Sequence, residues 1–123
     1  AVILATGRFM GKGLLSDRKG IFEPLFNLPL HQPADRTSWH HEQFLHPDGH
    51  PINSAGVEVD DLFRPVDGGG KPIYENLFAA GTILAHQDWM RMKCGSGLAI
   101  ATAYAAVNAF IENIMKTSRR ESA

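Results

Sequence analysis

Glu75-Asn76-Leu77-Phe78-Ala79-Ala80-Gly81 and, a short loop later, Cys94-Gly95-Ser96-Gly97 carry most of the structural information in this sequence. The first segment is an apolar run that ends at a glycine, which predicts a buried strand. The second segment is rich in glycine and precedes many small apolar residues, which predicts the start of a helix. Together, a strand end, a glycine loop and a helix N-terminus would expose backbone N–H groups that can hold a phosphate or a carbonyl-rich cofactor.

The remaining segments extend this pattern. Residues 2–5 form a continuous apolar run closed by Thr6-Gly7, which is typical of a strand covered on both faces. Residues 20–74 hold short apolar runs interrupted by prolines and glycines, including a hairpin expected over residues 64–74. From Ser96 the sequence predicts a long helix whose first half is apolar almost all round and therefore buried. Its second half is expected to be amphipathic, with Asn108, Glu112 and Lys116 on one face, and residues 117–123 to be a frayed polar tail.

Composition excludes several classes of protein. The 123 residues are 44% apolar and carry a net charge of −1 with the charges interspersed, which fits one globular domain and argues against a nucleic-acid partner. Cys94 is the single cysteine, so an internal disulfide is excluded and a reducing compartment is favoured. No uninterrupted apolar run approaches the roughly 18–20 residues of a membrane span, so no direct membrane crossing is expected.

The chain opens directly in the first expected strand, without an initiator methionine. A domain rarely begins inside a core strand. We therefore expect this sequence to be a fragment of a larger protein.

Two glycine-rich segments each allow more than one interpretation. Gly95-Ser96-Gly97 can place a helix N-terminus against a ligand, or Ser96 can simply cap the helix while the glycines form the turn. The segment at residues 7–13 resembles a phosphate loop, but its spacing is one residue short of G-x-x-x-x-G-K-[ST]. Gly13 also replaces the hydroxyl residue that binds magnesium, so a nucleotide hydrolase is not expected.

Several side chains raise the question of a metal site. Four histidines and an aspartate are concentrated in one irregular segment, namely His40, His41, His46, His50 and Asp48. The first two are adjacent and cannot face one point from a regular element, no thiolate joins the group, and the sequence around residue 48 is typical of turns. We therefore predict no metal site.

Three further residues are candidates for chemistry near the glycine loops. His86 and Asp88 lie between the predicted strand and helix, and they are candidates for proton handling or members of an ordinary polar loop. Cys94 follows Lys93 and precedes a helix, a setting that can lower the pKa of a thiol. No second cysteine exists to form a redox pair, so packing against a cofactor loop is the preferred role of Cys94.

In their order, these segments resemble the C-terminal part of a flavoprotein with two dinucleotide-binding folds, in the fumarate reductase and succinate dehydrogenase branch. The matching segments are residues 2–7, 56–65, 75–81 and 95–97, and they span nearly the whole chain. The run at residues 75–81 fits the pattern E-N-L-[FY]-A-[AI]-G of that branch.

Three shorter motifs resemble one family within this branch, the B subunits of anaerobic glycerol-3-phosphate dehydrogenases. They are Ala5-Thr6-Gly7-Arg8-Phe9, Gly20-Ile21-Phe22-Glu23-Pro24 and Cys94-Gly95-Ser96-Gly97. The resemblance implies an oxidoreductase of anaerobic respiration that helps oxidise glycerol 3-phosphate to dihydroxyacetone phosphate. It implies a catalytic A subunit and a membrane-associated iron–sulfur C subunit as partners, with electrons passing to quinone. It also implies a cytoplasmic protein, peripheral to the inner membrane through one of these partners.

The same resemblance implies a flavin, FAD or FMN, and a set of residues that hold it. These cofactor-binding residues would be Thr6, Gly7, Gly81, Thr82, Gly95, Ser96 and Gly97. Many relatives carry an acidic residue where this chain has Thr82, whose hydroxyl can still form a hydrogen bond. Lys93 falls near an active-site arginine of fumarate reductases, but we assign no catalytic residue. The glycine-rich dinucleotide fingerprint lies upstream in such proteins, so we expect this chain alone to bind flavin weakly or not at all.

The resulting prediction is an α/β fold, the C-terminal portion of a Rossmann-like FAD-binding fold with a long C-terminal helix. Residues 1–123 would form a single domain fragment, in which residues 1–19 and 75–117 are flavin-fold elements and residues 20–74 an irregular β-rich insertion on the substrate side. Two other functions stay open. One is a non-catalytic docking subunit that retains a flavoprotein fold. The other is a different flavin oxidoreductase, such as a fumarate reductase-like or 3-ketosteroid dehydrogenase-like enzyme.

Overall fold

Two short parallel strands form the centre of the computed structural model, which describes residues 1–122. Strand β1 (Val2–Leu4) pairs in parallel with β6 (Leu77–Ala79), with Ile3 opposite Phe78. All three residues of β6 are buried, whereas β1 is exposed at Val2 and buried at Leu4. The two predicted strands are therefore confirmed, although β1 is not covered along its whole length. A parallel pair joined by a long connection is consistent with an α/β fold.

The chain between β1 and β6 has little regular structure. Strand β2 (Leu15–Ser16) pairs with β3 (Ile21–Phe22), and β4 (Leu30–His31) pairs with β5 (Gly56–Val57), both antiparallel. Two 3-10 turns, η1 (Arg36–Ser38) and η2 (Pro51–Ser54), lie between β4 and β5. The expected β-rich insertion is thus reduced to two-residue strands and loops, because prolines and turn residues interrupt each apolar run.

Two polar turns organise this region. In the predicted hairpin, Val66 bridges Pro72, and the Asp67 carboxylate accepts hydrogen bonds from the backbone N–H groups of Gly69 and Lys71. Glu23, within the Gly20-Ile21-Phe22-Glu23-Pro24 motif, is only 1% exposed. Its carboxylate accepts backbone hydrogen bonds that fix the following turn, from Leu25, Phe26 and Leu28.

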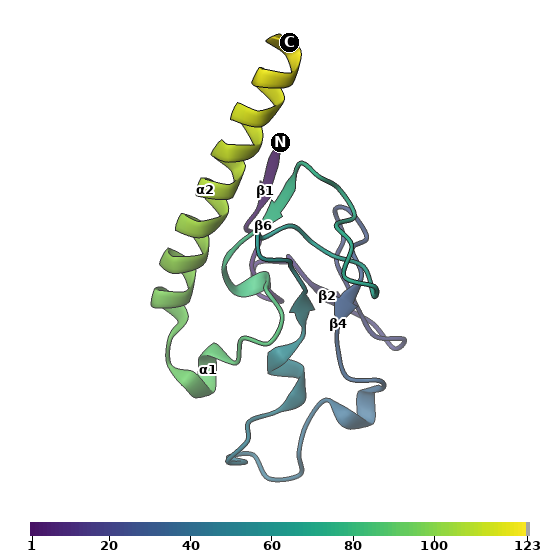
Figure 1. Cartoon of the computed structure of the whole chain (residues 1–123). Coiled ribbons are helices and arrows are strands. Elements are labelled where there is room, and N and C mark those ends of the chain that lie inside the picture. Colours follow the sequence, from purple (N-terminus) through teal and green to yellow (C-terminus); the bar gives the residue numbers. More distant parts are fainter. Residues whose placement is uncertain (123) are drawn as a thin grey trace.

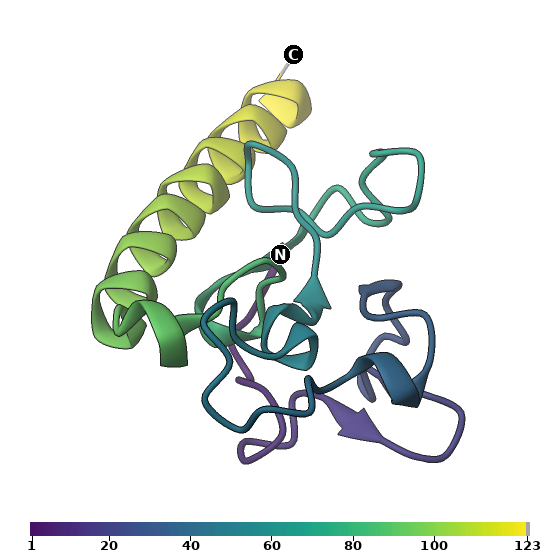
Figure 2. The same ribbon diagram turned by 90° about the horizontal axis from the view of Figure 1, so that it is seen from below.

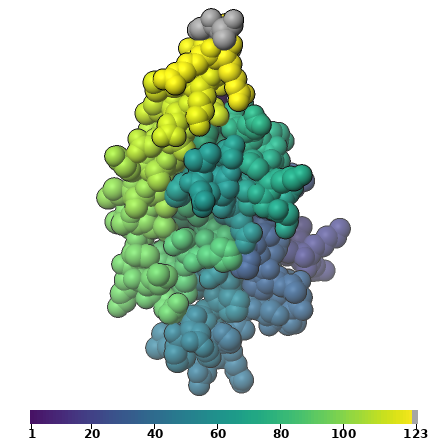
Figure 3. Space-filling model, in the orientation of Figure 1, coloured from purple at the N-terminus to yellow at the C-terminus, as the bar shows by residue number. Residues whose placement is uncertain are grey.

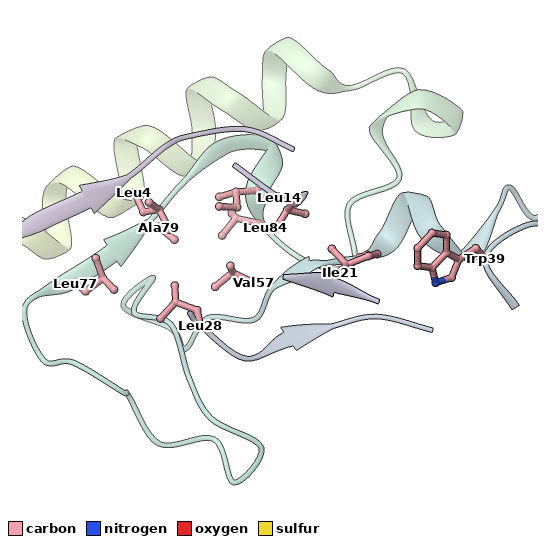
Figure 4. Close-up of a cluster of buried hydrophobic side chains, with 11 residues drawn as sticks. Leu4, Leu14, Ile21, Leu28, Trp39, Val57, Leu77, Ala79 and Leu84 are labelled. Carbon is pink, nitrogen blue, oxygen red and sulfur yellow. The ribbon is translucent and has the colours of Figure 1, made fainter. Parts of the chain in front are cut away.

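The hydrophobic core lies among the strands and turns that precede the long C-terminal helix (Figure 4). Most of its side chains come from the central strands and from residues that follow short turns, and one comes from a 3-10 turn, η3 (Gly81–Ile83). The buried members are Leu4, Leu14, Ile21, Leu28, Trp39, Ala55, Val57, Leu77, Ala79, Ile83 and Leu84.

Two helices follow η3. The single turn α1 (Trp89–Met92) is capped by the Asp88 carboxylate, which accepts a hydrogen bond from the backbone N–H of Arg91. Lys93 then adopts a left-handed conformation (φ +53°) before α2 (Gly95–Ser122) begins. Helix α2 starts one residue earlier than predicted and continues through the segment predicted to be frayed, while residue 123 lies outside the described residues.

Helix α2 is largely exposed, so the prediction that its first half is buried all round is wrong. It lies along one side of the molecule with its outer face uncovered (Figures 1 and 2). Among the helices and strands of residues 1–122, β1, β6, η3 and α1 make its main contacts. The uncovered face carries an exposed apolar stripe with the 4-3-4-3 spacing of one helix face, formed by Ile100, Tyr104, Val107, Ile111 and Ile114.

Composition alone makes α2 a possible membrane helix. Within the described residues, the segment from Gly95 to Glu121 is long enough and apolar enough to cross a membrane, and most of its apolar part is exposed. The helix contains no uninterrupted apolar run of that length, as expected from the sequence, but its average hydropathy still reaches the range of membrane helices because the polar residues are dispersed. A single helix of this kind is weak grounds for a membrane span, since core helices meet the same criteria.

The space-filling view shows where the irregular segment lies. The loop that contains residues 40–50 projects at the end of the molecule opposite to the C-terminus of α2 (Figure 3). The central strands and α1 lie between these two ends (Figure 1).

Candidate functional site

A mostly apolar cavity of about 370 Å³ lies where the loop after β1 meets η2, η3 and α1, and we call it the β1-end cavity. It brings together segments that are far apart in the sequence. Its lining residues are Gly7, Arg8, Phe9, Met10, Gly11, Ile52, Asn53, Thr82, Trp89 and Met90. Two of the seven predicted cofactor-binding residues, Gly7 and Thr82, are among them.

The loop after β1 closes tightly on itself. Gly7 has a positive φ of +71°, and the backbone N–H of Gly13 donates to the carbonyl of Arg8 at 2.9 Å. A Cβ atom at residue 13 would lie 1.9 Å from the Gly7 carbonyl oxygen, so only glycine fits there. Because the Gly13 N–H is used inside the loop, it is not free to hold a phosphate.

The Arg8 side chain ties this loop to the segment after β6. Its Nε donates to the Thr82 carbonyl at 2.5 Å, and its Nη2 donates to the carbonyls of Leu84 (3.1 Å) and Gln87 (2.9 Å). Its Nη1 donates to the Asn53 carbonyl of η2. A single side chain therefore fixes three walls of the β1-end cavity relative to one another.

A buried carboxylate lies near this guanidinium. Burial lowers the pKa of Arg8 from its ordinary value, and the charge of Asp88 partly offsets that effect. Asp88 is 5% exposed, and its carboxylate also lies 3.4 Å from the Nε of Arg91. Asp88, a candidate for proton handling, therefore acts structurally as the cap of α1 and as a countercharge for two arginines.

Two buried polar atoms at this site have no hydrogen-bond partner within the described residues, the Oγ1 of Thr6 and the Nε1 of Trp89. Trp89 lines the cavity, and Thr6 directly precedes the lining residue Gly7. A buried polar group without a partner costs about 1–3 kcal/mol, so each calls for an explanation. A flavin ring system is planar and apolar on its faces and carries hydrogen-bonding oxygen and nitrogen atoms at its edge. The apolar lining and the two unpaired polar atoms therefore fit a flavin.

The predicted cofactor residues of the two strand ends lie together. A Cβ atom at Gly7 would lie 3.7 Å from the Oγ1 of Thr82, so the two loops are in contact. Gly81, which precedes Thr82, donates its backbone N–H to the Oγ1 of Thr102 on α2 at 2.8 Å. The Gly81 N–H therefore holds η3 against the helix and is not available to a ligand.

The predicted residues at the helix start are placed differently. A Cβ atom at Gly95 would lie 3.5 Å from the ring of Trp89, so this glycine packs behind a wall of the cavity. Ser96 and Gly97 lie on the first turn of α2 and do not line the cavity. The proposed role of these last two residues in cofactor binding stays a prediction.

Two residues that shape the site carry no assigned role in the sequence analysis. The motifs mark Arg8 only as part of a family resemblance, and its four carbonyl partners lie 45–79 residues away. Trp89 follows Gln87 and Asp88 and precedes the glycine-rich helix start. Because a buried indole N–H usually has a hydrogen-bond partner, a tryptophan at this place in the sequence is a recognisable candidate for a ligand contact.

The chain matches a known domain family over the residues that line this cavity. The profile of the FAD binding domain family matches residues 1–98, which include all the residues that line the β1-end cavity. The chain belongs to the FAD binding domain family. This membership confirms the prediction of a flavin cofactor and favours FAD over FMN.

Within the FAD binding domain family, the chain is similar to the B subunits of anaerobic glycerol-3-phosphate dehydrogenases. It is 37% identical to the Vibrio cholerae protein of that name over 97% of this chain and 27% of the relative. It is 38% identical to a probable B subunit from Halobacterium salinarum over 91% of this chain and 26% of the relative. The resemblance inferred from the motifs is confirmed, and the chain spans about a quarter of the length of these relatives. No solved structure matches it.

Proposed function

We propose that this FAD binding domain chain forms one wall of the flavin site in a respiratory dehydrogenase subunit that takes part in the oxidation of glycerol 3-phosphate. The observation that carries the proposal is the buried, unpaired Nε1 of Trp89 in the lining of an apolar cavity. A second buried, unpaired atom, the Oγ1 of Thr6, belongs to the residue directly before the lining residue Gly7. The names of the similar proteins supply the substrate.

Different residues of the cavity would contact different parts of the cofactor. The hydroxyl of Thr6 and the indole N–H of Trp89 would donate to polar atoms at the edge of the flavin. The side chains of Phe9 and Ile52 would cover the ring and exclude water. Arg8 places a partly buried positive charge in the cavity lining, which favours any negative charge that develops there. When bound, FAD supplies the hydride-accepting chemistry.

We propose a Rossmann-like arrangement for the longer protein. The parallel β1–β6 pair and the long helix α2 support it, as does the match to an FAD-binding profile over residues 1–98. Residues 1–19 and 75–117 would belong to the flavin fold, and residues 20–74 would face the substrate. The exposed apolar stripe of α2 would then pack against other parts of that fold.

The proposed partners are a catalytic A subunit and a membrane-associated iron–sulfur C subunit that passes electrons to quinone. The support is that the similar proteins are named as B subunits, which implies further subunits. The proposed location is the cytoplasm, peripheral to the inner membrane through a partner.

The exposed stripe also favours a second function, a docking subunit that retains the fold without catalysis. Spectroscopy of the longer subunit separates the two. A flavin band that bleaches when glycerol 3-phosphate is added together with the A partner supports the redox function. A colourless protein that still assembles with its partners supports docking.

Substitutions at the two unpaired atoms test the flavin site itself. We expect Trp89→Phe, which keeps an aromatic ring but removes the N–H, and Thr6→Val to lower flavin occupancy of the longer subunit. Met90→Leu, an apolar change in the same lining, serves as the control and should leave occupancy unchanged. Full occupancy in both Trp89→Phe and Thr6→Val would contradict the proposed wall.

A further inference from the structure

A cluster of two histidines and one glutamate lies outside the β1-end cavity, and its members are His31, Glu58 and His86. One ligand atom from each side chain lies within 4.8 Å of the other two. The Nε2 of His86 is 2.7 Å from Glu58 Oε1, and the Nδ1 of His31 is 3.7 Å from the same oxygen. The two imidazole rings are 4.2 Å apart between centroids. Glu58 is thus the common partner of both rings.

Backbone hydrogen bonds hold the three residues in place from separate segments. His31 lies in β4 and pairs with Gly56 of β5, two residues before Glu58. Ala85 donates its N–H to the Val57 carbonyl at 2.9 Å, and His86 donates its N–H to the Ser54 carbonyl at 2.9 Å. The convergence of the side chains therefore follows from the fold and not from flexible surface contacts.

His86 has an unusual backbone conformation, with φ of +65°. Such a conformation is uncommon for residues other than glycine, and it is concentrated at functional sites. Here it accompanies an imidazole that meets both Glu58 and His31. The left-handed backbone of His86 thus accompanies the side-chain contacts that draw the cluster together.

The donor set suits a divalent transition metal. Imidazole nitrogen and carboxylate oxygen bind Zn²⁺ at about 2.0–2.2 Å, which places neighbouring ligand atoms about 3.3–3.6 Å apart. The separations of 2.7 and 3.7 Å from Glu58 Oε1 lie on either side of that range, so small side-chain shifts would bring the three groups to ligand spacing. Two histidines and one carboxylate leave other coordination positions open. The side chains are 41%, 44% and 58% exposed, so ions and water reach them.

We propose that His31, Glu58 and His86 form a binding site for a divalent transition-metal ion, with open positions for water or an anionic group. The site differs from the histidine-rich loop at residues 40–50, where the sequence first raised the question of a metal. There the rings of His41 and His46 stack on one another, 3.8 Å apart between centroids. The proposal does not depend on flavin binding.

Titration of the metal-free chain with Co²⁺ tests this site. We expect one Co²⁺ per chain, visible as a ligand-field absorption band, and displacement of Co²⁺ by Zn²⁺. Changes in outer hydrogen-bond partners already weaken metal sites about 10–100-fold. We therefore expect His31→Ala, Glu58→Gln and His86→Asn each to weaken binding at least about 10-fold. Asparagine is chosen at residue 86 because it tolerates a positive φ.

His46→Ala is the matched control, because it removes a histidine from the other loop and should leave binding unchanged. Circular dichroism of each variant shows that a loss of binding is not a loss of folding. Absence of Co²⁺ binding by the wild-type chain would overturn the proposal. So would binding that survives all three substitutions or that is lost in His46→Ala.

Discussion

At the scale of single residues, Arg8 is the clearest case of a side chain whose role depends on distant backbone. Its guanidinium donates to carbonyls of η2, η3 and the segment before α1. Hydrogen bonds from a charged donor are worth about 1.5–3 kcal/mol each, but burial of the charge offsets part of this gain. The net gain is therefore smaller than the sum of the four hydrogen bonds, whereas removal of the guanidinium alone would leave four carbonyls without their donor.

Replacement of Arg8 by methionine tests this role. Arg8→Met keeps the apolar stem of the side chain but leaves four carbonyls without their donor. We expect a loss of at least about 2 kcal/mol in the free energy of unfolding, measured by urea denaturation. Arg18→Met, at an exposed arginine, is the control and should change stability by less than about 0.5 kcal/mol. Equal stability of the two variants would contradict the crosslinking role.

At the scale of elements, helix α2 has two faces of opposite environment. Its inner face holds Thr102, whose hydroxyl accepts from the Gly81 N–H and donates to the Leu98 carbonyl, and the fully buried Ala106. Its outer face holds the exposed apolar stripe, with Ile100 and Tyr104 each 73% exposed. An uncovered apolar stripe of this kind promotes association with other apolar surfaces.

Charged substitutions should lower self-association on the outer face of α2 and lower stability on its inner face. We expect the double variant Ile100→Lys/Ile111→Lys to lower self-association and the fluorescence of a bound hydrophobic dye, with the unfolding free energy changed by less than about 0.5 kcal/mol per site. Ala106→Lys, on the inner face, should instead unfold the chain because it buries an unpaired charge. Light scattering and urea denaturation measure both effects. Unchanged self-association in the double variant would show that the exposed apolar stripe does not drive association.

The elements differ in how well the sequence predicts them. Strand β6 is buried throughout and β1 pairs along it, so a local apolar run is sufficient to identify both. The exposure of α2 was not predictable, because an apolar helix has the same sequence whether or not a neighbour covers it. In the site, the positions of Gly7 and Thr82 in the cavity lining can be expected because each residue follows the end of a predicted strand. The role of Arg8 cannot, because it depends on contacts between segments that are far apart in the sequence.

The metal-site candidate shows the same limit more sharply. His31, Glu58 and His86 belong to three segments that no local pattern connects, and only the pairing of β4 with β5 and the backbone bonds of His86 bring them together. The histidines that are close in sequence, at residues 40–50, raised the question of a metal, whereas the proposed cluster draws only on residues outside that segment.

At the scale of the whole molecule, the β1-end cavity is built by a chain that spans about a quarter of its relatives. The lining residues form one side of the proposed flavin site, and residues 1–122 hold no glycine-rich dinucleotide fingerprint to bind the rest of FAD. A cofactor of this size needs contacts along its full length for tight binding.

The chain alone should therefore bind FAD weakly. We expect purified chain to be colourless and to quench added FAD fluorescence only at high protein concentration, because most contacts to the dinucleotide are not supplied. The longer subunit, prepared in the same way, provides the comparison. Recovery of the 123-residue chain in yellow form with stoichiometric flavin would contradict this expectation.

The parallel pairing of β1 with β6 also governs the order in which the molecule can fold. Val2 pairs with Leu77, so this contact closes a loop that contains nearly all of the irregular segment. Contacts between such distant residues form slowly, because the entropy of loop closure is lost before the contact forms. At a synthesis rate of about 5–20 residues per second, β1 waits about 4–15 s for its partner strand. During that interval the apolar β1 strand is a target for chaperones, and premature aggregation is the competing outcome.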